Sequence, residues 1–215
     1  MADAATGGLW QNRNFRRLFG ASAVSNLGDG VAAMAYPWLA TLLTRDPLLV
    51  SMVAVAGRLP WVLIALPAGV WTDRADRLKL MIGANLVQTV LTLVVAGLVV
   101  GLSVLPLGAA PVLILSALVF LLGVAEVLRD NSAQTFLPAV VPGRDLEQAN
   151  GRVWAAEQVV NQFAGPPLGG VLIGLALWAP FAFDALSFAG AAVLLAGIRV
   201  PRPVPPPPRG FWAEL

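Results

Sequence analysis

One apolar stretch, Leu78–Leu102, reads LKLMIGANLVQTVLTLVVAGLVVGL and carries a single charge, Lys79. A helix of roughly 20 such residues crosses about 30 Å of bilayer hydrocarbon. Because a backbone in lipid must satisfy its hydrogen bonds within its own segment, the stretch predicts a transmembrane helix. Five more runs of this kind predict five more helices: Leu18–Leu43, Leu49–Trp71, Pro111–Val127 or somewhat beyond, Val153–Leu177 and Pro180–Ile198.

The composition is that of a membrane protein with an all-α fold. Hydrophobic residues make up 58% and charged residues 12% of the 215 residues, and the mean hydropathy is +0.77, outside the usual range of soluble domains. We expect one integral membrane six-helix bundle over residues 15–198. Residues 1–14 are expected to form a cytoplasmic N-terminal segment, and the proline-rich residues 199–215 a cytoplasmic linker that starts a longer central loop.

The basic residues predict the orientation in the membrane. Only Arg45 lies in an odd-numbered connection between runs, so the positive-inside rule places both termini of this multi-pass protein in the cytoplasm and the chain in the cell membrane. Anionic lipid headgroups, and not nucleic acid, are the expected partners of these scattered charges. Apart from Arg58 inside the second run, the others lie at the chain ends or in the second and fourth connections: Arg13, Arg16, Arg17, Arg74, Arg77, Lys79, Arg129, Arg144, Arg152, Arg199, Arg202 and Arg209.

The absent residue types and motifs limit the chemistry. Without cysteine or histidine, the chain lacks thiolates, the commonest metal ligand and the usual proton carrier near neutral pH, so we expect no metal or cofactor and carboxylates as proton sites. It has no Gly-x-x-x-x-Gly-Lys-Ser/Thr phosphate loop and no clustered serine, carboxylate and base. An ATP-driven pump and a membrane enzyme are therefore not expected.

Two connections carry structural expectations. Asn12 or Asn14 is a candidate cap for the first helix. Phe136–Asn150, which contains Pro138 and Pro142, predicts the longest connection, a loop with one surface turn.

The stretch Gly69–Lys79 reads GVWTDRADRLK, with an aspartate four residues after the glycine. It resembles the loop signature of the major facilitator superfamily, although Asp76 stands where that family usually has glycine and Leu78 where a basic residue is usual. An ordinary charged interfacial loop is the alternative. The resemblance implies a conformational gating role for Gly69, Asp73, Arg74 and Arg77, in which the aspartate caps and pairs with neighbouring helix ends.

The fifth run contains Gly165-Pro166-Pro167-Leu168-Gly169-Gly170. This is similar to a Gly-Pro-x-x-Gly-Gly element of exporters in that superfamily, although upstream glycines of the full pattern are missing. The resemblance implies an exporter-type helix kink at Gly165, Pro166, Gly169 and Gly170, since prolines remove backbone donors. Tight helix packing is the alternative explanation for the same glycines.

The resemblance extends over about residues 10–200 and is to the enterobactin-exporter-like, drug-efflux branch. It is also carried by Ser25–Gly30, Glu126–Asn131, Ala149–Arg152 and Asp184–Phe188. It implies half of a twelve-helix major facilitator fold, built as two inverted three-helix repeats.

Charged residues inside the runs are candidate proton-coupling or cavity residues, because a charge in lipid is costly unless it faces protein or water. Asp29 either binds protons or pairs with Arg58. One helical face carries Glu126, Arg129 and Asp130. The alternative to a coupling role is that these three residues form an ion cluster at the cytoplasmic end of the helix. Asp184 is expected to be a structural cap. Glu157 shares a polar stripe with Asn161 and is a candidate for cavity lining or coupling.

These observations predict the N-terminal half of a secondary transporter, a proton-coupled exporter of an amphipathic small molecule such as a drug or siderophore. Its expected partners are the bilayer, substrate, protons, and either a missing C-terminal six-helix half or a second copy of the chain. The alternatives are a non-transporting accessory or structural subunit and an inactive truncated fragment.

Overall fold

The computed structural model describes residues 8–101 and 108–199, and these residues contain helices and no strand. The proline-rich linker lies outside them except for Arg199, and the N-terminal segment is described from Gly8 onward. The longer helices are α1 (Arg13–Leu43), α2 (Pro47–Leu63), α3 (Ala65–Arg74), α4 (Arg77–Val100), α5 (Ala109–Val140), α6 (Leu146–Gln158), α7 (Gly165–Leu175) and α8 (Ala179–Ala196). Short helical segments are η1 (Leu9–Gln11), η3 (Gly143–Asp145) and the π-helix η4 (Val159–Ala164).

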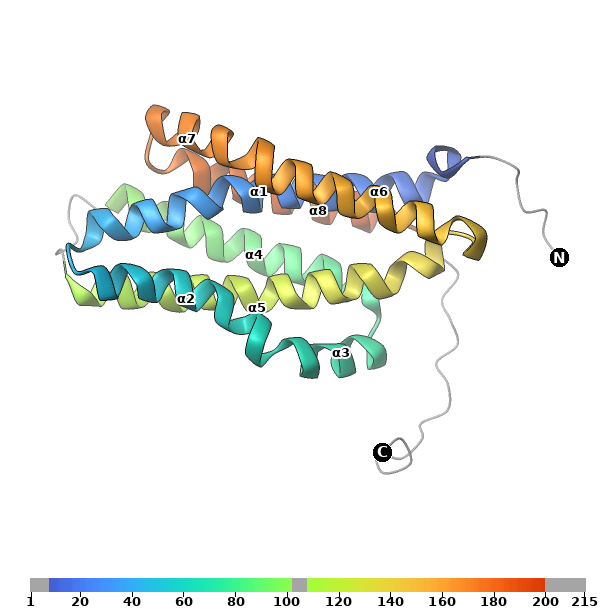
Figure 1. Ribbon diagram of the computed structural model, residues 1–215, viewed down its shortest axis with the longest axis horizontal. Coiled ribbons are helices and arrows are strands. Elements are labelled where there is room, and N and C mark those ends of the chain that lie inside the picture. Colours follow the sequence, from blue (N-terminus) through green and yellow to red (C-terminus); the bar gives the residue numbers. More distant parts are fainter. Residues whose placement is uncertain (1–7, 102–107, 200–215) are drawn as a thin grey trace, which may run out of the picture.

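Most helices lie side by side along one long axis, while α3 turns away from it (Figure 1). Helix α8 packs against α1 and α4, α5 packs against α2 and α4, and α7 packs against α1. The start of α1 meets the end of α8, where Asn14 Nδ2 donates a 2.9 Å hydrogen bond to the Arg199 carbonyl. Arg17 also donates to the Gly197 carbonyl. Helix α1 therefore begins at the same end of the molecule at which helix α8 ends.

Two clusters of buried apolar residues fill the interior. One includes Phe15 and Leu18 of α1, Phe136 of α5 and Leu195 of α8. The second joins other parts of α1 and α5 to α2, α4 and α8, and contains Leu39, Val53, Val95, Leu115 and Phe181. Each cluster draws on residues far apart in sequence, so both ends of the helix assembly have a packed core.

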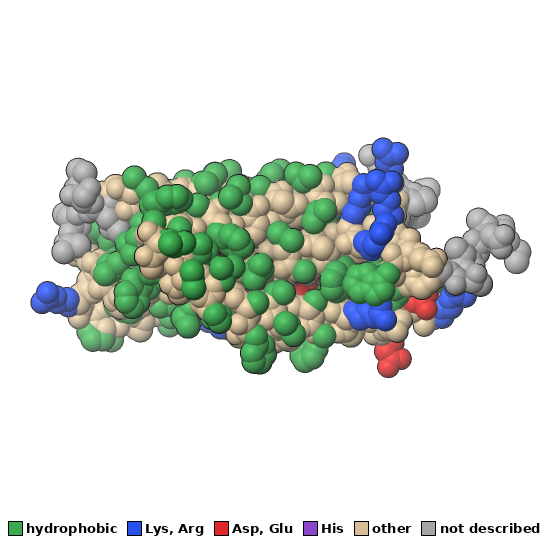
Figure 2. Space-filling view, turned by 90° about the horizontal axis from the view of Figure 1, so that it is seen from above, with side chains coloured by type: hydrophobic (Ala, Val, Ile, Leu, Met, Phe, Trp, Pro, Cys, Tyr) green, Lys and Arg blue, Asp and Glu red, His purple; other side chains and the backbone are tan. Residues whose placement is uncertain are grey.

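The outer surface is strongly apolar. Leu66 is 86% exposed, Val62 77% and Leu175 75%, and hydrophobic side chains cover most of the length of the molecule, while basic ones gather mainly towards one end (Figure 2). By length and composition, α4, α5 and α8 could each cross a membrane, and α2 with α3 makes a fourth candidate. A surface of this kind suits a lipid environment.

The second predicted run is broken, because α2 and α3 meet at an angle of 54°. The break lies at Ile64. Pro67 explains it, since proline has no N–H to donate to the carbonyl of Leu63 and its ring crowds that carbonyl.

The loop predicted over Phe136–Asn150 is wrong. Helix α5 continues to Val140, a 3₁₀ turn covers Gly143–Asp145, and α6 begins at Leu146. Apolar packing outweighs the loop signal of Pro138, because Phe136 and Val140 are buried in a core cluster, whereas Pro142 lies in the short connection after α5.

The predicted cap at Asn12 is confirmed. Its Oδ1 accepts hydrogen bonds from the backbone N–H groups of Asn14 at 3.0 Å and Phe15 at 3.1 Å. Its Nδ2 donates to the Val140 carbonyl at 2.7 Å, so the same residue joins the start of α1 to the end of α5.

Candidate functional site

A buried arginine lies at the centre of the polar interior. Arg129 of α5 is 4% exposed, and its Nη2 lies 2.8 Å from Asp29 Oδ2 of α1. Its Nε lies 2.9 Å from Asp130 Oδ1, and Nη1 donates to Gln88 Oε1 of α4 at 3.3 Å. The guanidinium also stands over the Phe188 ring of α8, 5.6 Å from its centre. One side chain thus contacts residues of α1, α4 and α8.

The extension of α5 past Val127 explains this placement. Because the helix runs on to Val140, Arg129 and Asp130 are internal helix positions and not part of a connection. Arg129 was predicted as a connection residue, and its burial between helices corrects that prediction.

Of the two roles considered for Asp29, the pairing with Arg58 is wrong. Asp29 pairs with Arg129, while Arg58 lies on an exposed position of α2. Arg58 is instead within electrostatic range of Glu126, a half-buried residue of α5. The pairing required the two side chains to face each other, and Asp29 instead faces Arg129 of α5.

Carboxylates outnumber the buried cation. Asp29, Asp130 and Glu126 all lie within electrostatic range of Arg129, and the side chains of Asp29 and Asp130 are 16% and 28% exposed. Since one arginine neutralises one unit of negative charge, protonation of an acid in this group relieves repulsion among the others. The arrangement is suited to binding and releasing protons.

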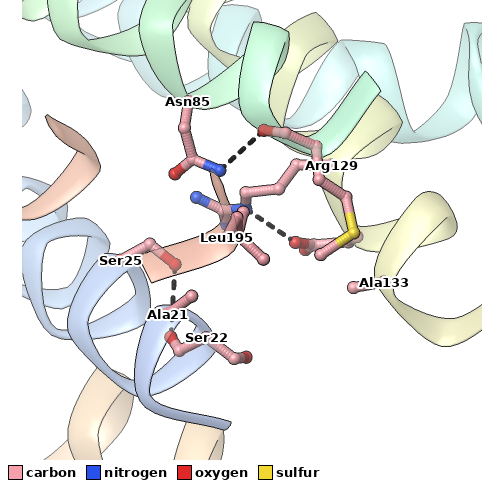
Figure 3. A pocket seen from close by; sticks show the side chains of 9 residues that line it. Ala21, Ser22, Ser25, Asn85, Arg129, Ala133 and Leu195 are labelled. Carbon is pink, nitrogen blue, oxygen red and sulfur yellow. Dashed lines mark hydrogen bonds and ion pairs between the residues drawn. The ribbon is translucent and has the colours of Figure 1, made fainter. Parts of the chain in front are cut away.

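A small cavity adjoins the arginine (Figure 3). Its volume is about 20 Å³, enough for one water molecule. Asn85 of α4 and Arg129 lie beside it in the close-up, and Ser22 and Ser25 of α1 lie on its other side. The full lining is Ala21, Ser22, Ser25, Met81, Asn85, Arg129, Asp130, Ala133 and Leu195.

Glu157 of α6 reaches the same cavity through Ser22. The Ser22 hydroxyl donates a hydrogen bond to the Glu157 carboxylate, and Ser22 itself lines the cavity. A polar path therefore runs from half-exposed Glu157 through Ser22 and the cavity to Asp130 and Arg129. Asn161, one turn after Glu157, is half-buried.

The predicted exporter-type kink coincides with irregular helix geometry and with close packing. The π-helix Val159–Ala164 comes directly before Gly165, where Pro166 and Pro167 have no N–H to continue the α-helical bonding. A Cβ on Gly165 would lie 2.6 Å from Gly30 Cα, and one on Gly169 would lie 2.7 Å from the Val31 carbonyl oxygen, whereas Gly170 faces open space. Gly165 and Gly169 therefore allow close contact with α1.

The predicted gating loop is mostly helical. Gly69, Asp73 and Arg74 lie on α3, and Arg77 is the first residue of α4. Arg77 Nη2 lies 3.1 Å from Asp73 Oδ1, and its Nη1 donates to the Thr135 carbonyl of α5 at 3.3 Å. The cap of α4 is made by Asp76, which accepts from the Lys79 N–H at 3.2 Å, and not by Asp73.

Several polar partners were missed by the sequence reasoning, most clearly on α4. Asn85, Gln88 and Thr92 are buried on that helix. Their spacing of three and four residues inside an otherwise apolar run places them on one helical face. That stripe was the signal that could have identified the α4 contribution to the site. Among the described residues, no cluster of three or more aspartate or glutamate side chains could hold a metal ion.

An apolar helical assembly with buried charges is typical of an integral membrane protein such as a transporter. The family model described as transmembrane secretion effector matches residues 7–208. The chain belongs to this family, and the predicted resemblance to the drug-efflux branch of the major facilitator superfamily is confirmed. The family is one of transporters and not of enzymes.

Two efflux proteins are similar to this chain over most of its length. Macrolide efflux protein A of Streptococcus pyogenes is 26% identical over 193 residues, covering 87% of this chain and 45% of the relative. The multidrug efflux pump Tap of Mycolicibacterium fortuitum is 28% identical over 155 residues, covering 71% of this chain and 37% of the relative. The chain thus spans less than half the length of these relatives. No solved structure matches it significantly.

Proposed function

We propose that this chain is the N-terminal half of a proton-coupled secondary exporter that moves an amphipathic small molecule out of the cell. The observation that carries the proposal is the buried Asp29–Arg129 pair between α1 and α5, which adjoins the cavity and further carboxylates. The names of the two relatives, a macrolide efflux protein and a multidrug efflux pump, support export and suggest a macrolide-like drug as the substrate. A siderophore is the second candidate substrate.

The proposed architecture is a six-helix bundle that makes up half of a twelve-helix fold. Its crossings are α1, α2 with α3, α4, α5, α6 with α7, and α8. The second member of each group of three is interrupted, by the bend at Ile64 and by the π-helix Val159–Ala164. Interruptions at corresponding positions support two inverted three-helix repeats. In this architecture residues 15–198 form the bundle, residues 1–14 the N-terminal segment and residues 199–215 the linker.

The proposed orientation puts both termini in the cytoplasm. The contact between the start of α1 and the end of α8 supports a shared side for both ends. The gathering of basic side chains towards one end of the molecule supports the cytoplasm as that side (Figure 2).

The proposed mechanism is alternating access biased by protons. With Asp29 ionised, its bond to Arg129 ties α1 to α5. With Asp29 protonated, that attraction weakens and Asp130 is the carboxylate that remains paired with Arg129. Protonation and substrate then favour different arrangements of the helices. Glu157, Asn161, Glu126 and Arg58 are proposed to line the path or to share in the coupling. Asp73, Arg74 and Arg77 are proposed to stabilise one access state through the contact of Arg77 with α5.

The proposed transport unit needs a second half, because the chain spans less than half of its relatives. A C-terminal six-helix half or a second copy of this chain could supply it. The alternative function is a membrane accessory or structural subunit that transports nothing.

A transport assay separates these functions. The unit is purified from its native membrane through a tag on this chain, so that the other half accompanies it, and is placed in liposomes with a radiolabelled macrolide and an imposed pH gradient. We expect gradient-driven macrolide movement that Asp29→Asn abolishes. A purified unit that moves no macrolide under the gradient, or that moves it equally well with Asp29→Asn, would favour the accessory function.

A further inference from the structure

Three polar side chains meet where α1, α4 and α8 pack together. They are Tyr36 of α1, Thr92 of α4 and Asp184 of α8. Thr92 is fully buried and Asp184 is 2% exposed. Asp184 lies within α8, whose N-cap is Trp178, so the expectation that Asp184 is a structural cap is wrong. None of the three belongs to the polar path described above.

The polar atoms of this cluster lack hydrogen-bond partners. Tyr36 OH, Thr92 Oγ1 and Asp184 Oδ1 are all buried and unpaired. The Thr92 hydroxyl lies close to both of the other groups, but neither contact has the geometry of a hydrogen bond. A buried polar group without a partner costs about 1–3 kcal/mol, and an unpaired buried charge costs more, so the charge state of Asp184 matters most for the stability of this cluster.

The charges around Asp184 determine whether its carboxylate can remain ionised. No ion pair of the described residues includes Asp184, and the ionisable groups within electrostatic range of it include Asp29 and Tyr36 of α1 and Glu126 and Arg129 of α5. Arg129 is already paired with two aspartates. Helix α7 has no ionisable side chain, and α4 carries only Arg77 and Lys79, in its first turn. An ionised carboxylate here would be buried among acids without a cation of its own, which is strongly unfavourable.

We propose that Asp184 is a second proton-binding site of this protein, separate from the Asp29–Arg129 pair. A proton taken from water bonds to a carboxylate oxygen of Asp184. After a small adjustment of the side chains, the resulting O–H can donate to the Thr92 hydroxyl, which in turn can donate to the Tyr36 oxygen. One proton thereby removes the uncompensated buried charge and leaves three neutral polar groups beside one another.

The second site is close enough to the first to influence it. A Cβ on Gly28, next to Asp29, would collide with Asp184 Oδ1 and Ser187 Oγ, so the backbone of α1 passes directly over the Asp184 carboxyl. Phe188, one turn after Asp184, supports the Arg129 guanidinium at 5.6 Å. A shift of α8 that opens Asp184 to water would therefore also move a contact of Arg129. This use of the site in transport rests on the proposed function, whereas the protonation of Asp184 does not.

Infrared spectroscopy tests the protonation directly. The full chain is placed in lipid bilayers, and the C=O stretching band of protonated carboxyl groups is recorded for wild type, Asp184→Asn, Asp29→Asn and Glu126→Gln. Circular dichroism confirms that each variant is folded; if Asp184→Asn does not fold, Thr92→Val replaces it and should shift the band. We expect a band that Asp184→Asn removes and that the other two variants leave in place. A wild-type spectrum without the band, or a band unchanged in Asp184→Asn, overturns the proposal.

A pH titration of the same band tests proton exchange. We expect reversible loss of the Asp184 band as the pH rises while the helical content stays constant. A band that persists until the protein unfolds would make Asp184 a permanently neutral side chain and would overturn its role as a proton site. A titrating band in a unit that fails the transport assay would reject the proposed function and leave the second proton site standing.

Discussion

Arg129 Nη2 lies 2.8 Å from Asp29 Oδ2, and this contact joins α5 to α1 in the interior of the molecule. Replacing Arg129 with Met leaves Asp29 and Asp130 without their cation. We expect a loss of about 3–5 kcal/mol in the free energy of unfolding, the range for a buried ion pair that loses one partner. Asp29→Asn should cost less, because Arg129 keeps Asp130 at 2.9 Å.

Tryptophan fluorescence during unfolding in detergent measures both changes, since the chain has seven tryptophans. Equal stability losses for Arg129→Met and Asp29→Asn would mean that Arg129 does not hold this group of acids together.

The glycines of the fifth run allow a sharp comparison. Gly165→Ala places a methyl group 2.6 Å from Gly30 Cα, whereas Gly170→Ala places one in open space. We expect Gly165→Ala to destabilise the chain by about 1–3 kcal/mol through overpacking, and Gly170→Ala to leave its stability unchanged or slightly raised. Thermal unfolding of the two variants gives the answer, and equal midpoints would contradict close packing between α7 and α1.

Asp73 and Asp76 should behave differently although they are three residues apart. Asp76 caps α4, so Asp76→Ala should lower the free energy of unfolding by about 1 kcal/mol. Asp73→Asn breaks an exposed ion pair with Arg77 and should change stability by less than about 1 kcal/mol, yet slow macrolide transport if Asp73 acts in gating. Lys79→Gln, which breaks the 3.9 Å pair with Asp76, serves as the control. Full transport by Asp73→Asn would rule out the gating role.

The path through Ser22 predicts a dependence on Glu157. Glu157→Gln keeps an acceptor for the Ser22 hydroxyl but cannot carry a proton, so we expect a large loss of gradient-driven export with little change in stability. Glu147→Gln is the matched control, because Glu147 is exposed in the first turn of the same helix. If neither substitution changes the rate of export, Glu157 is not part of the coupling path.

The sequence predicted the helices well and their irregularities partly. Apolar runs identify α4, α5 and α8 because burial in lipid imposes one requirement along the whole segment. The end of α5 was placed too early, since Arg129 and Asp130 look like interface charges until their partners on other helices are known. The bend at Ile64 and the π-helix before Gly165 both lie where a proline removes a backbone hydrogen bond. The sequence shows the positions of the prolines but not the change in helix geometry that follows.

The sequence identified several residues of the candidate site as candidates, but neither its polar and aromatic partners on α4 and α8 nor the pairings of its charges. Asp29, Arg129, Asp130 and Glu157 were identified because charges inside apolar runs are costly. Their contacts were not, because helix rotation decides whether Asp29 faces Arg58 or Arg129. Gln88, Thr92 and Phe188 were missed because each is an ordinary residue for a transmembrane helix when taken alone.

Labelling with an impermeant thiol reagent tests the proposed membrane topology most directly, since the chain has no cysteine of its own. Single cysteines are introduced by Ala75→Cys, between α3 and α4, and by Arg45→Cys, between α1 and α2. We predict that the cysteine at position 45 reacts in intact cells and that the one at position 75 reacts only after the membrane is permeabilised. Reaction at position 75 from outside intact cells would contradict the topology on which the proposed exporter is built.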